Sequence, residues 1–108
     1  MMRFEAVIAL FPELPPPQLR DWVARGWVRV EGATPEEWMF ADRDIARIHL
    51  IRDLRIGMAV DENALPVVLS LVDQVHGMRR TLQALRRALA EQPEDVRRSL
   101  LDALTRQR

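Results

Sequence analysis

The first quarter of the chain has apolar residues at helical spacing. Two short helices are predicted, the first from residue 4 to Pro12 and the second from the prolines at 15–17 to Gly26, because proline and glycine interrupt helices. Their apolar residues at steps of three and four are Phe4, Val7, Ile8 and Phe11, then Leu19, Trp22 and Val23. Two short helices joined by a few residues form a helix-turn-helix candidate.

Beyond Gly26 the apolar period changes to two, which predicts a β-hairpin over residues 28–40. Apolar Val28, Val30, Trp38 and Phe40 alternate with Arg29, Glu31 and Met39. The intervening residues 32–37 have the glycine and proline that a turn requires. A third helix, with Asp42 as its N-cap, is predicted by Ile45, Ile48, Ile51 and Leu54. We therefore predict a mainly α fold with a winged helix-turn-helix head over residues 1–58.

The second half of the chain, residues 59–108, predicts a long helix and a short last one. After Gly57, a cap at Asp61 or Asn63 and Pro66 mark the start of the long helix. Its apolar residues follow steps of four and three, which is a heptad seam: Ala64, Val68, Leu71, Val75, Met78, Leu82, Leu85 and Leu89. Pro93 ends this helix, and residues 94–104 predict a short helix with Val96, Leu100, Leu101 and Leu104 facing inward.

The seam is too long to be covered by a head of this size. It spans roughly 40 Å of helix at about 1.5 Å per residue. We expect a homodimer whose interface contains Val68, Leu71, Val75, Met78, Leu82, Leu85 and Leu89. The sequence leaves both helix directions open, but Arg79, Arg80, Arg86 and Arg87 of two parallel chains would repel each other, which favours an antiparallel pair.

Composition excludes several functions. The chain has 108 residues, no Cys, and equal numbers of basic and acidic residues, 16 of each. No charge-free stretch is long enough to cross a bilayer and no signal peptide is recognisable, so we expect no membrane partner and a cytoplasmic protein. The two histidines, His49 and His76, suggest no metal site, and no glycine-rich phosphate loop is present. We expect no catalytic residues, no metal and no cofactor.

The charge of the head argues against nucleic-acid binding. Residues 1–42 contain four Arg and seven acids, which is the wrong sign for a protein that reads a phosphate backbone. Arg20 and Arg25 on the second helix are nevertheless the candidates for DNA contact. A DNA-binding regulator is therefore the disfavoured alternative.

Four segments resemble the N-terminal half of a MerR-type regulator: Leu19–Val23, Gly26–Val28, Trp38–Ile48 and Ile51–Arg55. The chain departs from that pattern at Glu37–Met39, where such regulators have glycine, arginine and tyrosine. The segment Gly57–His76 resembles more closely the chaperone-modulator (CbpM-like) branch of this fold, and the similarity covers about residues 4–90. This resemblance implies a protein that binds the J-domain of a DnaJ-like (CbpA-type) co-chaperone and inhibits its stimulation of an Hsp70.

An inhibitor that competes for the basic helix of a J-domain needs acids and apolar contacts. The wing of the head is the predicted hairpin over residues 28–40. The candidate contact residues are Glu31, Glu36, Glu37 and Trp38 of the wing, and Asp61 and Glu62 at the start of the long helix. Solvated surface acids and a core Trp are the alternative interpretation of these six residues. A purely structural dimer module also stays open, because the heptad seam is the strongest single pattern in the chain.

Overall fold

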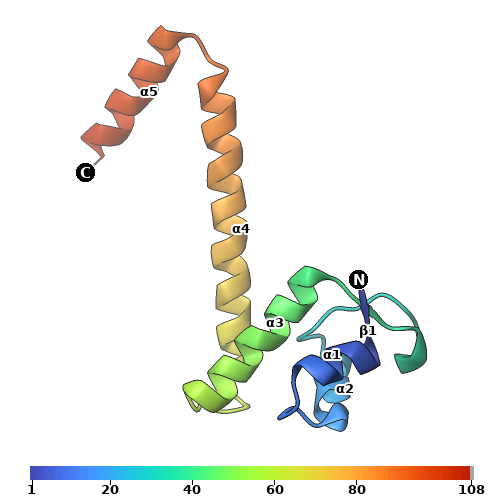
Figure 1. Ribbon diagram of the computed structural model, residues 1–108. Helices are drawn as coiled ribbons and strands as arrows, with labels where there is room; N and C mark the ends of the chain where they lie inside the picture. Colours follow the sequence, from blue (N-terminus) through green and yellow to red (C-terminus); the bar gives the residue numbers. More distant parts are fainter. Residues whose placement is uncertain (108) are drawn as a thin grey trace. The chain divides into compact units, whose positions relative to one another are not determined.

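The computed structural model describes residues 1–107 and is mostly helical, with one small antiparallel sheet (Figure 1). Its elements are β1 (Met2–Arg3), α1 (Phe4–Leu10), α2 (Pro16–Ala24), η1 (Pro35–Glu37), β2 (Met39–Phe40), α3 (Asp42–Arg52), η2 (Asp53–Gly57), α4 (Leu65–Ala90) and α5 (Glu94–Arg106). η1 is a 3₁₀ turn and η2 a π turn. All five helices predicted from the sequence are present.

The chain divides into two units, Met1–Leu69 and Ser70–Arg108, which we call the N-terminal and C-terminal units. Arg108, the last residue of the predicted 59–108 segment, lies outside the described residues. None of the helices within residues 1–107 is long and apolar enough to cross a membrane.

The hydrophobic core lies in the N-terminal unit and draws on every helix of it. Its buried side chains are Val7, Phe11, Leu14, Leu19, Trp22, Trp27, Val28, Trp38, Phe40, Ile48, Ile51, Leu54, Leu65 and Leu69. Leu65 and Leu69 are one helical turn apart, so the start of α4 presents one face to this core. The removal of these apolar side chains from water is the main stabilising term of the unit.

The small sheet differs from the predicted hairpin. β2 pairs with β1 at the N-terminus, in the register Met2 with Phe40 and Arg3 with Met39. Of the predicted hairpin only one bridge forms, in which Glu31 and Met39 exchange backbone hydrogen bonds of 3.2 and 2.9 Å. The prediction of a strand over residues 28–31 was wrong, because β2 is only two residues long and offers these residues a single bridge at Met39.

The end of α2 follows the sequence prediction. Gly26 has φ +78°, and its N–H donates to Val23 O at 3.0 Å, while Trp27 N–H donates to Trp22 O at 3.0 Å. This pair of bonds is a Schellman motif, which satisfies carbonyl groups that the helix leaves free. The glycine turns the chain away so that Trp27 and Val28 enter the core.

The N-cap of α3 differs from the predicted one. Ala41, not Asp42, is the N-cap residue, and the carboxylate Oδ2 of Asp44 accepts the Ala41 N–H at 2.8 Å. A carboxylate at the third helical position can reach back in this way, whereas Asp42 is exposed. Asp44 is only 7% exposed, so its hydrogen bond is shielded from water.

Substitution at these two acids tests the correction. We expect Asp44→Ala to lower the free energy of unfolding by about 2 kcal/mol, because it leaves the Ala41 N–H without its acceptor. Asp42→Ala, the matched control in the same helical turn, removes only a charge near the helix N-terminus and is expected to cost about 0.5 kcal/mol. Urea denaturation measures both values. A larger loss of stability for Asp42→Ala than for Asp44→Ala would show that Asp42 caps α3, as the sequence predicted.

Candidate functional site

The loop over residues 31–38 carries the predicted acidic surface. Glu31, Glu36 and Glu37 are all exposed, and η1 holds the last two in one tight turn. Glu37 has a local role, because its Oε2 accepts the Ala33 N–H at 3.4 Å. The side chains of Glu31 and Glu36 have no hydrogen bond or ion pair with any residue in the range 1–107. Two carboxylates of this loop are therefore available to a partner.

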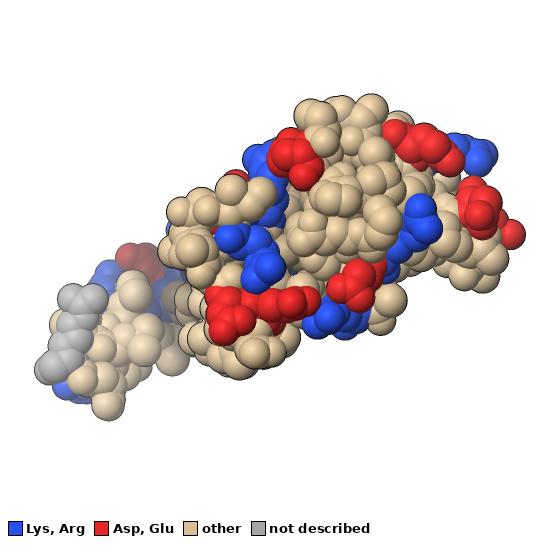
Figure 2. Space-filling view, turned by 90° about the horizontal axis from the view of Figure 1, so that it is seen from below, with Lys and Arg blue, Asp and Glu red and all other residues tan. Residues whose placement is uncertain are grey.

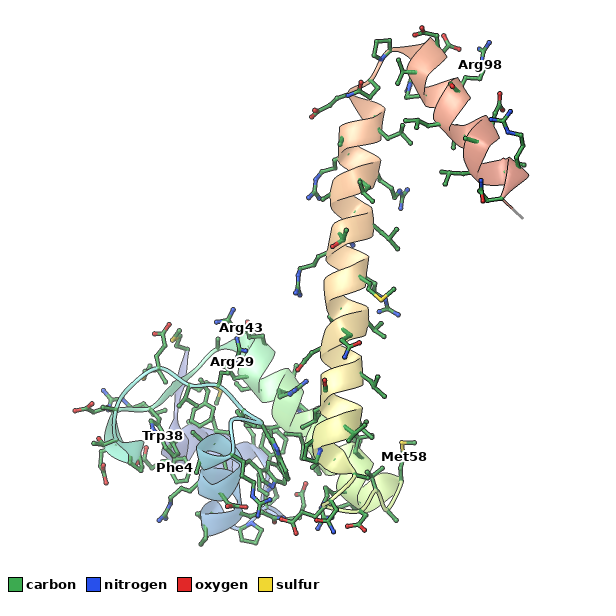
Figure 3. The ribbon with its side chains drawn as sticks, turned by 180° about the vertical axis from the view of Figure 1, so that it is seen from behind. Phe4, Arg29, Trp38, Arg43, Met58 and Arg98 are labelled. Atoms are coloured by element: carbon green, nitrogen blue, oxygen red, sulfur yellow. The ribbon has the colours of Figure 1, made fainter. Side chains whose placement is uncertain are left out.

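Trp38 does not belong to this exposed surface. It is 9% exposed, and its ring lies edge-on to Phe4 at 5.7 Å and to Phe40 at 6.4 Å between ring centroids. Figure 3 shows Trp38 and Phe4 next to each other in the N-terminal unit. The interpretation of Trp38 as a partner contact was wrong, and its alternative interpretation as a core residue is confirmed.

Asp61 and Glu62 hold local structure at the start of α4. The Asp61 Oδ1 accepts the Asn63 N–H at 3.0 Å, and its backbone oxygen accepts Ala64 and Leu65 N–H. The Glu62 Oε1 lies 3.1 Å from Arg25 Nη2. Within the part of the chain that the structure describes, no hydrogen bond or ion pair joins these two acids to the 31–38 loop. The acids of the two segments therefore differ in their surroundings, because Glu62 pairs with Arg25 whereas Glu31 and Glu36 are unpaired within residues 1–107.

The two arginines of the DNA-binding alternative differ in their surroundings. Arg25 contacts two carboxylates, Asp21 at 2.9 Å and Glu62 at 3.1 Å, and its guanidinium lies 5.0 Å from the Trp27 ring centroid. Its side chain is exposed as well, and the two carboxylates offset part of its charge. Arg20 is exposed, with its guanidinium 5.6 Å from the Phe4 ring centroid. The surface view also shows acidic and basic side chains interspersed on the face in Figure 2, without a broad basic area.

An open hollow next to the 31–38 loop was not predicted from the sequence. Its apolar side is formed by Phe4, Ile8, Pro16 and Pro35. Its charged residues are Glu5, Arg20 and Glu36. Glu5 was missed because α1 and η1 are thirty residues apart, and no local pattern indicates that they share a surface.

The heptad seam of α4 is mostly exposed. Leu71, Val75, Met78, Leu82 and Leu85 are 46–65% exposed, and Leu89 is half-buried. Val68 differs from the others because it packs against the core of the N-terminal unit. A row of large apolar side chains of this length is unusual for a surface without a partner.

The apolar residues of α5 are exposed as well. Val96, Leu100, Leu101 and Leu104 are between 37% and 64% exposed, so the prediction that they face inward was wrong for this chain by itself. Their spacing places them on one face of the helix. The C-terminal unit therefore has two uncovered apolar faces, one on each helix.

Arg52, the last residue of α3, forms a surface ion pair with Glu13 that helps to lower the pKa of the Glu13 carboxyl group. Arg52 Nη1 donates to Glu13 Oε1 at 3.0 Å. A backbone hydrogen bond at Glu13, and next the hydrogen bond from Arg52, lower the pKa of this carboxyl group below its usual value. A lowered pKa in the folded state favours folding above the pKa of the unfolded chain. This contribution is lost as the pH falls through the folded-state pKa.

Removal of the Arg52 guanidinium is expected to raise the pKa of Glu13. Arg52→Gln should raise the pKa of Glu13 part of the way to its usual value, because the backbone hydrogen bond remains. Carboxyl ¹³C shifts followed by NMR between acid and neutral pH give the value. Arg55→Gln is the control, because Arg55 donates to Val60 O and not to Glu13. An unchanged Glu13 pKa in Arg52→Gln would show that the ion pair is not formed in solution.

His49 packs on an aromatic ring and lies beside an arginine. His49 lies against Phe11, with 4.6 Å between ring centroids, and its Nδ1 is 3.2 Å from Arg52 Nη2. Among residues 1–107, no group of three His, Cys, Asp or Glu side chains is placed to hold a metal ion.

Comparisons of the chain with protein-family models, curated proteins and solved structures give no match. The similarity of residues 4–90 to the chaperone-modulator family rests on the packing residues quoted above. Membership in that family stays a prediction.

Proposed function

We propose that this chain is a chaperone modulator that binds the J-domain of a DnaJ-like co-chaperone and inhibits its stimulation of an Hsp70. The observation that carries the proposal is the pair of exposed, unpartnered carboxylates of Glu31 and Glu36 on the 31–38 loop. A basic helix of a partner is attracted to such a surface, which speeds and orients the encounter. The order α1, α2, 31–38 loop, α3 is that of a winged helix-turn-helix head, which is part of the same proposal.

The same features argue against the MerR-type DNA-binding alternative. Phosphate groups are bound by cations that are free to reach them. Arg25 is exposed but paired with Asp21 and Glu62, whereas Arg20 of α2 is exposed and has no ion pair within residues 1–107. The 31–38 loop adds exposed acids where a DNA-binding wing needs basic residues.

We also propose that the protein is a homodimer through the seam of α4. Burial of five large apolar side chains from each copy supplies the driving force, at about 1.5–3 kcal/mol for each side chain fully buried. An antiparallel pair that aligns the two seams separates Arg86 and Arg87 of one copy from those of the other, whereas Arg79 and Arg80 lie near its midpoint. Distances between spin labels at Asn63 test this direction, because an antiparallel pair holds the two labels near opposite ends of the paired helices.

Calorimetric titration tests the proposed function. The purified chain is titrated into the isolated J-domain of a DnaJ-like co-chaperone from the same genome at about 150 mM salt, with nonspecific duplex DNA as the parallel titrant. We expect saturable binding to the J-domain, no binding to DNA, and loss of J-domain-stimulated Hsp70 ATPase activity at stoichiometric amounts. Salt-sensitive DNA binding without J-domain binding would instead support the regulator.

A further inference from the structure

The hollow beside the 31–38 loop is lined by both apolar and charged residues. It has a volume of about 450 Å³ and is open to solvent. Phe4 and Ile8 of α1 are half-buried and still contribute to its lining, as do Pro16 and Pro35. The Phe4 ring therefore lines the hollow and also makes a T-shaped contact with Trp38.

The charged residues of the hollow are not neutralised by one another. No hydrogen bond or ion pair within residues 1–107 engages the carboxylate of Glu5 or of Glu36. Arg20 lines the same hollow, yet it lies over the Phe4 ring, 5.6 Å from the centroid, rather than in an ion pair with either acid. Two exposed carboxylates are thus left for a ligand, while the Phe4 ring is contacted by Arg20.

The side chains that match this combination are Arg and Lys. Their methylene groups pack on apolar surface while the charged end stays near solvent. A guanidinium or ammonium group is attracted both to carboxylates and to the face of an aromatic ring. Arg20 already uses the Phe4 ring in this manner, which demonstrates that a cation fits there.

We propose that this hollow is the docking site for a basic segment of the partner protein, which places one Arg or Lys side chain against Phe4 and Ile8 with its charge near Glu5 and Glu36. The proposal rests on the proposed function and names the part of the surface that the J-domain uses. Arg20 has the same charge as the incoming side chain and lies on the same ring, so it weakens docking. Glu5 thereby strengthens binding of the J-domain, and Arg20 weakens it.

Three variants of the full-length chain test the site by titration with the same J-domain. Glu5→Gln with Glu36→Gln is expected to raise the Kd about tenfold, as the loss of two exposed ion pairs implies. Arg20→Gln is expected to lower the Kd about threefold, because it removes the competing cation. The control Glu91→Gln with Asp102→Gln removes two exposed acids outside the hollow and is expected to leave the Kd within about twofold. Circular dichroism checks that each variant is folded.

The outcomes separate this site from the proposed function. Unchanged J-domain affinity in Glu5→Gln with Glu36→Gln would overturn the docking site and leave the function standing. If the natural chain does not bind the J-domain, the function fails, and a synthetic amphipathic Arg-rich peptide then tests the hollow by NMR. Shifts of the Phe4 and Ile8 amides that the double variant abolishes would support the site, and their absence would overturn it. Duplex DNA binding that Arg20→Gln abolishes would also overturn it.

Discussion

A variant in which Met78 and Leu82 are both replaced by Glu is expected to be a monomer at concentrations where the natural chain is a dimer. Both side chains are exposed, at 65% and 58%, and lie in the middle of the seam of α4. In the proposed dimer each variant chain would bring two carboxylates into an apolar interface, at a cost of several kcal/mol for each buried charge. Sedimentation equilibrium measures the change directly.

The control for this variant changes the same helix away from the seam. Ser70→Glu with Gln83→Glu adds the same two charges at exposed positions outside the seam and is expected to leave the dimer intact. A dimer that persists in Met78→Glu with Leu82→Glu would show that the two chains meet elsewhere. A natural chain that sediments as a monomer at every concentration would remove the homodimer from the proposal.

The second large effect is expected at Gly32. Its φ is +110°, and a Cβ atom added there would lie 2.5 Å from Glu37 O and 2.7 Å from Glu37 C. Those atoms are backbone, so they move only if η1 moves with them. We expect Gly32→Ala to lower the free energy of unfolding by at least about 2 kcal/mol and to displace the loop that holds Glu36.

Gly26→Ala is the matched control for this effect. Gly26 also has a positive φ, +78°, but a Cβ atom there meets nothing within 4 Å. Its expected cost is the left-handed backbone conformation alone, about 1 kcal/mol. Guanidinium denaturation of the two variants gives the difference. Equal losses of stability would mean that the approach of Glu37 to Gly32 contributes nothing.

The helices could be predicted because their signals are local. Proline and glycine mark the ends of α1, α2 and α4, and apolar spacing identifies the buried faces. Ile48, Ile51 and Leu54 are all buried, as their three-residue spacing indicated. The Schellman motif at Gly26 also needs only neighbouring residues.

The errors arise where distant segments decide the outcome. The alternation of residues 28–31 fits a strand, but the partner that β2 takes comes from Met2 and Arg3, which lie far away in the sequence. Trp38 is buried because Phe4 packs against it, and Glu5 lines the hollow because α1 lies near η1. The N-cap of α3 was misassigned by one residue, because Asp42 and Asp44 have the same chemistry and the sequence does not show which of them bonds back to the helix start.

Because the seam of α4 is exposed in the single chain and covered in the proposed dimer, the stability of the protein depends on its concentration. A protein stabilised by its own association has a melting temperature that rises with its concentration, because dilution favours the separated and unfolded chains. Under the proposed function, the amount of this protein in a cell would then set both how many J-domains it occupies and how long each copy survives. A fall in its synthesis would shorten the lifetime of the molecules already made, and the co-chaperone would be released more steeply than simple dilution predicts.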